Sequence, residues 1–358
     1  MNSKQEKLIN NLTEHSMGAD FVFAPNLYSK GSKGKREPAD IVWACNNCII
    51  LMTMTKSRAS SEKMFKHNMG QLKGWLRIWK TGEILRGNSH NTKYEIAYHD
   101  FDFKILISVV DGRNATAEYH NDLKNELNNK GYEVTACITI PQLAMVYLAH
   151  NGGSTRDLLN FIKALKESGK SLNAEEALNL LKVQHKQAFD KSGAAQLCLN
   201  YETDDHLKNI IRILRGTRAS KNFTLKPING EMKLNEFLVI LNDLSWFELI
   251  SICYTLQNMH SNIISVPIGD YGARACMTEM IFPPYQFILS VAALDSSFDK
   301  FTRESTKIAK KMSNIQFNLN TVMITLLSPN ANGFLLLPII AVEPRVSVSA
   351  TEQVLLNW

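Results

Sequence analysis

Two short apolar segments joined by a tight turn constrain the fold of this chain more than any other feature. Ile41 to Ala44 and Ile49 to Met54 each fit a strand, and Cys45-Asn46-Asn47-Cys48 connects them. Asparagine tolerates the positive φ angles that a two-residue hairpin turn requires. The sequence therefore predicts a β-hairpin between residues 41 and 54.

Helical and strand-like segments alternate on either side of this hairpin. Apolar spacing predicts helices over residues 4–17, 60–81 and 116–129. Apolar stretches predict further strands over residues 21–24, 103–110 and 133–140. The resulting order, α-β-β-β-α-β-α-β, is typical of a mixed sheet flanked by helices and places the N-terminal half in the α/β class.

The remainder of the chain is predicted to form more helices and then a second domain. Helices are expected over residues 141–149, 154–168 and 173–188, and the periodicity is lost over 189–205. We therefore divide the chain into residues 1–196 and a C-terminal α+β domain, residues 197–358. The elements expected in that domain are helices near 204–215, 232–243, 245–260 and 295–313, and strands near 262–267, 280–293, 316–328 and 333–349.

Composition restricts the class of protein. With 358 residues, 45% apolar and 21% charged, the chain can bury a large core, which excludes wholesale disorder and collagen-like repeats. Its longest apolar run, residues 333–342, is about half the roughly 20 residues of a membrane span, so no membrane association is expected. A polar N-terminus and six scattered cysteines predict free thiols in a reducing cytoplasm.

The segment KREPADIVWACNNCIILMTMTK, residues 35–56, carries the most informative pattern. An acidic residue opens one strand, and the strand after the turn ends in Lys. This layout resembles the restriction-endonuclease-like fold of the PD-(D/E)XK nucleases. HNMGQLKGWLRIW (67–79) resembles the helix that follows the Lys strand there, in which Gln71 and Trp75 would line the active-site groove. ITIPQLAMVYLAHNGGSTRDLLNFIKALKES (138–168) resembles a helical segment of bacterial nuclease-like proteins of unknown function.

The resemblance covers roughly residues 10–170 and implies a role for each matching residue. Asp40 would be the central acid, with Glu37 and Glu14 as further acids around Mg²⁺, for which Mn²⁺ could substitute. Carboxylate oxygens suit such hard cations, which polarise a phosphate and lower the pKa of a bound water. Lys56 would position the water, and Gln71 would orient Lys56 or the phosphate.

One position departs from the family pattern. The acid that should stand two residues before Lys56 is replaced by Met54, whose thioether is a poor ligand for Mg²⁺. Either Glu14 or Glu37 supplies the missing oxygen, or the site does not hydrolyse its substrate. Each residue also has a simpler interpretation, with Asp40 satisfying loop amides and Lys56 a solvated charge at the end of a strand.

A basic segment precedes the hairpin. Lys30, Lys33, Lys35 and Arg36 stand in a turn-forming loop and could contact a phosphate backbone. The expected function is metal-dependent cleavage of nucleic acid, DNA more than RNA, in bacterial defence against foreign DNA. The alternative is a nuclease-like module that binds nucleic acid or a partner protein without cleaving. In either case the C-terminal domain would recognise a partner or regulate the first domain, unless it houses the activity itself.

Overall fold

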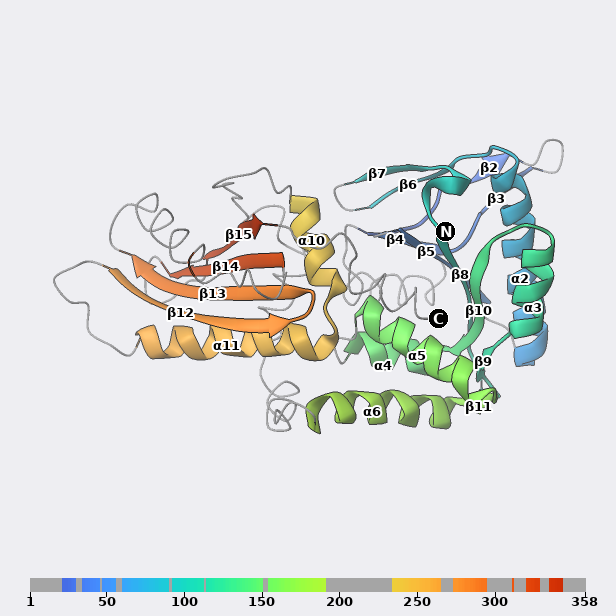
Figure 1. The fold of residues 1–358 in the computed structure, drawn as a ribbon. Coiled ribbons are helices and arrows are strands. Elements are labelled where there is room, and N and C mark those ends of the chain that lie inside the picture. The colour runs from blue at the N-terminus through green and yellow to red at the C-terminus, as the bar shows by residue number, and fades with distance from the viewer. Residues whose placement is uncertain are drawn as a thin grey trace. The chain divides into compact units, whose positions relative to one another are not determined.

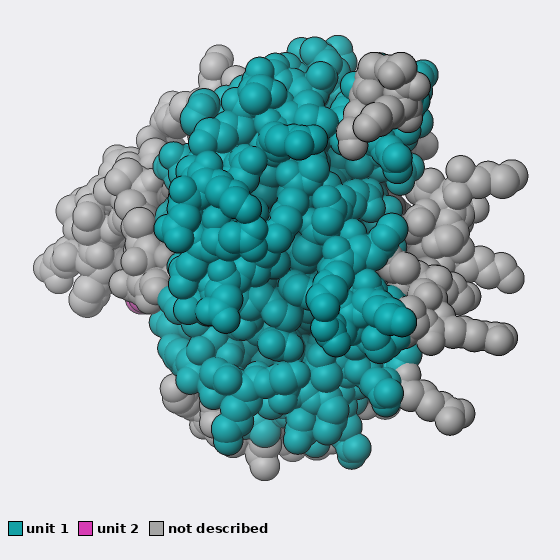
Figure 2. Space-filling model, turned by 90° about the vertical axis from the view of Figure 1, so that its right-hand side faces the viewer, with its two compact units in different colours: residues 1–191, 351–358 teal, residues 192–350 magenta. Residues whose placement is uncertain are grey.

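The computed structural model describes residues 21–29, 34–45, 47–55, 60–89, 92–112, 114–150, 154–190, 234–264, 273–294, 320–328 and 335–343, together with Lys311. Contacts divide the chain into two compact units, residues 1–191 with 351–358, and residues 192–350 (Figures 1 and 2). No helix in the described ranges has both the length and the apolar character needed to cross a bilayer. The predicted boundary at residue 196 and the predicted helices over 4–17, 204–215 and most of 295–313 lie outside these ranges.

A seven-stranded mixed sheet forms the centre of the first unit, in the order β1-β4-β5-β8-β10-β9-β11. Strands β5, β8 and β10 run parallel to one another, whereas β4 is antiparallel to both β1 and β5, and β9 is antiparallel to β10. The strand bounds are β1 Val22–Phe23, β4 Ile41–Cys45, β5 Cys48–Thr55, β8 Phe103–Val110, β9 Thr116–Tyr119, β10 Val134–Pro141 and β11 Leu172–Asn173.

Helices cover both faces of this sheet. On one face lie α2 (Ser61–Lys80) and α3 (Asn121–Asn129), and on the other lie α4 (Gln142–His150), α5 (Thr155–Ser168) and α6 (Ala174–Asp190) (Figure 1). Two small hairpins, β2 (Tyr28–Ser29) with β3 (Lys35–Arg36) and β6 (Leu85–Asn88) with β7 (Lys93–Ile96), stand beside it. The predicted α/β architecture with a mixed sheet flanked by helices is confirmed.

The predicted hairpin between residues 41 and 54 is also confirmed. Cys45 pairs with Cys48 across a two-residue turn, and Asn47 takes a φ of 50°, as such a turn requires. Both cysteines are buried and free, and burial raises the pKa of the Cys48 thiol well above its usual range.

Helix α2 packs one face against β5 and β8. Its N-cap is Ser60, whose hydroxyl accepts a hydrogen bond from the Lys63 amide, and it ends at Lys80, one residue before the predicted end. Trp75 and Trp79 are fully buried in the core beneath it, and the Trp79 indole donates to the Ile96 carbonyl at 3.1 Å. This packing fixes the orientation of the opposite, exposed face of α2.

Three sequence predictions are wrong in detail. Residues 116–119 form strand β9 rather than the start of a helix, because they pair with β10 and β11. Residues 280–293 are not one strand but parts of two, separated by a turn at Pro283-Pro284. Residues 262–264, expected to begin a strand, end helix α11.

The second unit has two helices and a four-stranded sheet in its described ranges. The sheet order is β12-β13-β14-β15, with only β13 and β14 parallel. In this unit the Tyr285 hydroxyl donates a hydrogen bond of 2.6 Å to the buried carboxylate of Asp243. The bounds are α10 Leu234–Asp243, α11 Trp246–Ile264, β12 Ala273–Phe282, β13 Tyr285–Leu294, β14 Asn320–Ser328 and β15 Leu335–Glu343.

Candidate nucleic-acid interface

Asp40 lies at the carboxyl end of the parallel strands, where open α/β sheets commonly bind ligands. Its amide donates to the Met52 carbonyl at 2.9 Å, and its carboxylate accepts a hydrogen bond of 2.5 Å from the Met54 amide. The last pair of the β4–β5 ladder is Ile41 with Met52, and Asp40 stands directly beyond it. The carboxylate therefore takes the place of a backbone acceptor at the end of the β4–β5 ladder. Beyond this point the chain leads to Lys56.

The described residues do not complete a metal site around Asp40. Met54 is nearly buried, with 8% of its surface exposed, and offers no oxygen ligand. Within the described ranges, no group of three His, Cys, Asp or Glu side chains is placed to hold a metal ion. Glu37 is exposed, while Glu14 and Lys56 lie outside those ranges, so their expected roles stay predictions.

A row of polar side chains crosses the sheet beneath the first half of α2. Thr53, Ser108 and Thr139 are aligned on β5, β8 and β10, and all three are buried. Asn68 of α2 donates to the Ser108 hydroxyl at 2.8 Å and to the Thr53 carbonyl at 3.4 Å. Because Asn68 reaches β5 at Thr53, it holds α2 and the end of this strand in fixed relative positions.

His120 closes this polar row at the far side. Its Nε2 lies 2.7 Å from the Thr139 hydroxyl, and its ring stacks on Phe65 of α2 at a centroid distance of 3.8 Å. Burial lowers the pKa of His120 to about 4, so the imidazole is neutral at physiological pH. The arrangement is suited to packing and hydrogen bonding rather than to carrying charge.

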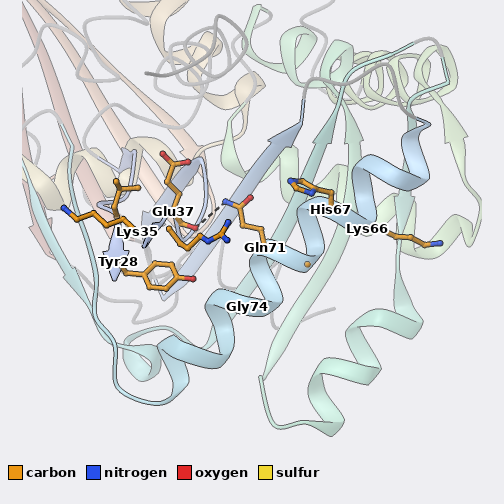
Figure 3. A pocket seen from close by; sticks show the side chains of 10 residues that line it. Tyr28, Lys35, Glu37, Lys66, His67, Gln71 and Gly74 are labelled. Carbon is orange, nitrogen blue, oxygen red and sulfur yellow. Dashed lines mark hydrogen bonds between the residues drawn. The ribbon is translucent and has the colours of Figure 1, made fainter. Parts of the chain in front are cut away.

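A cavity of about 720 Å³ opens between the β2–β3 hairpin and the exposed face of α2 (Figure 3). Gln71 lines it and donates to the Glu37 carbonyl at 3.4 Å, so the helix and the segment leading to Asp40 meet there. The residues around the cavity are Leu27, Tyr28, Lys35, Arg36, Glu37, Lys66, His67, Gly70, Gln71 and Gly74.

Cations outnumber carboxylates around this cavity. Lys35, Arg36 and Lys66 line it, against the single carboxylate of Glu37. Lys66 forms a 2.6 Å ion pair with Glu62 in which both side chains are more than two-thirds exposed, so this pair is weak and easily exchanged. The excess of positive charge suits an anionic ligand.

Tyr28 forms part of the cavity wall and packs on the core. Its ring lies 4.9 Å from that of Trp75, and burial raises the pKa of its hydroxyl, with Arg36 and Arg77 opposing the shift. The hydroxyl therefore stays protonated at physiological pH. The expectation that Trp75 lines the groove is wrong, because Trp75 is fully buried and Tyr28 lies against it.

Two glycines in the middle of α2, Gly70 and Gly74, also line the cavity. A glycine inside a helix costs about 1 kcal/mol relative to alanine. Apart from its chain neighbours and the backbone of its own helix, a methyl group at either position would meet no atom of the described residues within 4 Å. Packing within this part of the chain therefore does not explain the two glycines, and the free space adjoins the cavity.

Sequence reasoning found part of this site. Of the four predicted phosphate contacts, Lys35 and Arg36 line the cavity, whereas Lys30 and Lys33 lie outside the described ranges. It missed Tyr28 and the residues of α2 other than Gln71. The two glycines were the available signal, because they interrupt an otherwise strong helical pattern.

Comparisons with protein-family models, curated proteins and solved structures found no match to this chain.

Proposed function

We propose that the first unit binds the phosphate backbone of nucleic acid in the cavity between β2–β3 and α2. The observation that carries this proposal is that Lys35, Arg36 and Lys66 all line one cavity that has a single carboxylate. Cationic side chains supply most of the affinity of proteins for nucleic acid, and amides such as that of Gln71 add hydrogen bonds to phosphate oxygens.

Binding of labelled oligonucleotides, followed by fluorescence anisotropy at several salt concentrations, tests this proposal. The double variant Lys35→Gln/Arg36→Gln should bind roughly tenfold or more weakly and should reduce the slope of log K against log salt by about 1 to 1.5. The matched control is Lys170→Gln/Lys182→Gln, which removes the same charge from exposed positions near α5 and α6. Equal affinity for both double variants would refute the assignment.

Phosphodiester cleavage is the second candidate function. It is favoured by the position of Asp40. The Asp40 carboxylate lies at the end of β5, the strand that leads to Lys56. The described residues do not complete a Mg²⁺ site, so this candidate depends on Glu14, Glu37 or a further group supplying oxygen ligands.

Cleavage of plasmid, single-stranded DNA and RNA with Mg²⁺ or Mn²⁺ tests the second candidate. Activity that is lost in both Asp40→Asn and Lys56→Ala would support it. Activity that survives both substitutions would place the reaction elsewhere, and binding without cleavage would leave the binding module as the function.

The biological setting is also a proposal. The buried free thiols of Cys45, Cys48 and Cys137 suit a reducing compartment such as the cytoplasm. Defence against foreign DNA and recognition of a partner protein by the C-terminal unit stay predictions from the resemblance.

A further inference from the structure

We infer that the cavity between β2–β3 and α2 takes unpaired nucleotides of a single strand rather than a duplex. This inference rests on the proposed function, because it names the form of nucleic acid that the same cavity would bind. It is carried by the apolar and aromatic wall of the cavity, its size, and the free space over the two glycines.

The wall contributed by β2 is suited to contact with a base. Tyr28 packs on Trp75 and also lines the cavity, and the neighbouring Leu27 is 51% exposed. In Figure 3 the Tyr28 ring projects from its strand toward the part of α2 that carries Gly74. Aromatic side chains bind unpaired bases by stacking, whereas the bases of a duplex are stacked on one another and out of reach.

The size of the cavity agrees with this ligand. A volume of about 720 Å³ lies within the range of sites that enclose small molecules, roughly 300 to 1,000 Å³. A nucleotide-sized group fits into such a space. A duplex could only lie across its mouth.

The glycines allow a ligand to approach α2 closely. Apart from the chain neighbours and the backbone of α2 itself, no atom of the described residues lies within 4 Å of where a side chain at Gly70 or Gly74 would begin. Both positions line the cavity opposite the Tyr28 wall. A sugar or phosphate held between that wall and α2 would therefore touch the helix backbone, and an added methyl group would occupy its place.

The cations mark the path of the strand. Lys35, Gln71 and Lys66 all line the cavity, and in Figure 3 the two lysine side chains point away from each other with Gln71 between them. A strand that crosses the cavity would meet a positive charge on entering and on leaving. Lys66 would exchange its exposed partner Glu62 for a phosphate.

Competition binding with the full chain tests this inference, using one sequence as a single-stranded oligonucleotide and as its blunt duplex. We expect the single strand to bind at least tenfold more tightly. Gly74→Ala should weaken single-strand binding about tenfold while raising the thermal midpoint, since alanine favours the helix and meets open space. Tyr28→Phe, which keeps the ring, should bind the single strand more tightly than Tyr28→Leu.

The other outcomes separate the two proposals. Equal affinity for single strand and duplex, both weakened by Lys35→Gln/Arg36→Gln, would overturn this inference and leave the proposed function standing. No binding of either oligonucleotide would overturn both. If Gly70→Ala and Gly74→Ala change self-association in sedimentation and leave oligonucleotide binding unaltered, the glycines serve a contact between helices and the inference is wrong.

Discussion

The hydrogen bond between the Asp40 carboxylate and the Met54 amide gives the most discriminating prediction about the end of the β4–β5 hairpin. Asp40→Ala removes the acceptor of this 2.5 Å bond, whereas Asp40→Asn keeps a neutral oxygen in its place. The two variants therefore separate the structural role of Asp40 from any role of its charge.

The magnitude follows from the surroundings of the bond. A hydrogen bond to a charged group contributes about 1.5–3 kcal/mol, and a buried donor left without an acceptor costs about 1–3 kcal/mol. Because Asp40 is only partly buried, water can replace part of the lost contact. We expect Asp40→Ala to lower the free energy of unfolding by about 1.5–2 kcal/mol and Asp40→Asn by about half as much.

Urea denaturation followed by tryptophan fluorescence measures this difference. Trp43, Trp75 and Trp79 are buried in the first unit and are three of the five tryptophans in the chain, so the signal reports mainly on that unit. Asp40→Ala as stable as the wild type would show that the bond contributes nothing to the fold. Asp40→Asn as unstable as Asp40→Ala would show that the charge itself, not the acceptor, stabilises the native state.

Three further changes test the packing of α2 and its surroundings. Ser60→Ala removes the N-cap of α2 and should lower the free energy of unfolding by about 1 kcal/mol, an effect that Ser60→Asp should largely avoid in the same urea titration. Asn68→Ala removes two buried hydrogen bonds and should cost about 2–3 kcal/mol, and a loss below about 0.5 kcal/mol would contradict the geometry. Burial lowers the pKa of His120 from near 6.5 to about 4, so the unfolded state binds more protons between these values and stability should fall as the pH drops through this window. The free energy of unfolding lost over this window is at most about 3 kcal/mol. When the urea midpoint is measured against pH, His120→Gln should show a smaller decrease between these pH values than the wild type.

The elements whose own residues mark both their type and their ends were predictable from the sequence. Residues 103–110 form β8 with the predicted bounds, because a mostly apolar run is closed by Asp111-Gly112. The helix expected over 60–81 is α2, in which the Ser60 cap and the buried tryptophans agree on one helix. In these segments local preference and packing point to the same structure.

The elements that were missed depend on distant partners. Thr116–Tyr119 becomes a strand only because β10 and β11 lie beside it, and the sequence contains no sign of that pairing. The hairpin of β6 and β7 was not predicted, and its Gly87 lies so close to the Phe23 ring that a side chain would collide with it. The turn at Pro283-Pro284 was readable, since such a dipeptide commonly ends a strand.

Some residues of the candidate site were predictable from the sequence, but the cavity was not. The hairpin register brought Asp40 to the end of β5, and the basic segment around Lys35 and Arg36 does line a cavity. The cavity itself arises from the approach of β2–β3 to α2. Because it joins segments about 40 residues apart, the position of Tyr28 beside the cavity could be found only from the folded chain.

Mapping where nucleic acid touches the protein tests the central claim most directly. A single-stranded oligonucleotide carrying 4-thiouridine is crosslinked to the full chain by light, and the modified peptides are identified by mass spectrometry. If a single strand occupies this cavity, we expect crosslinks within residues 27–28, 35–37 and 66–74, the segments that contribute its lining. Crosslinks confined to the second unit or to α5 and α6 would contradict it.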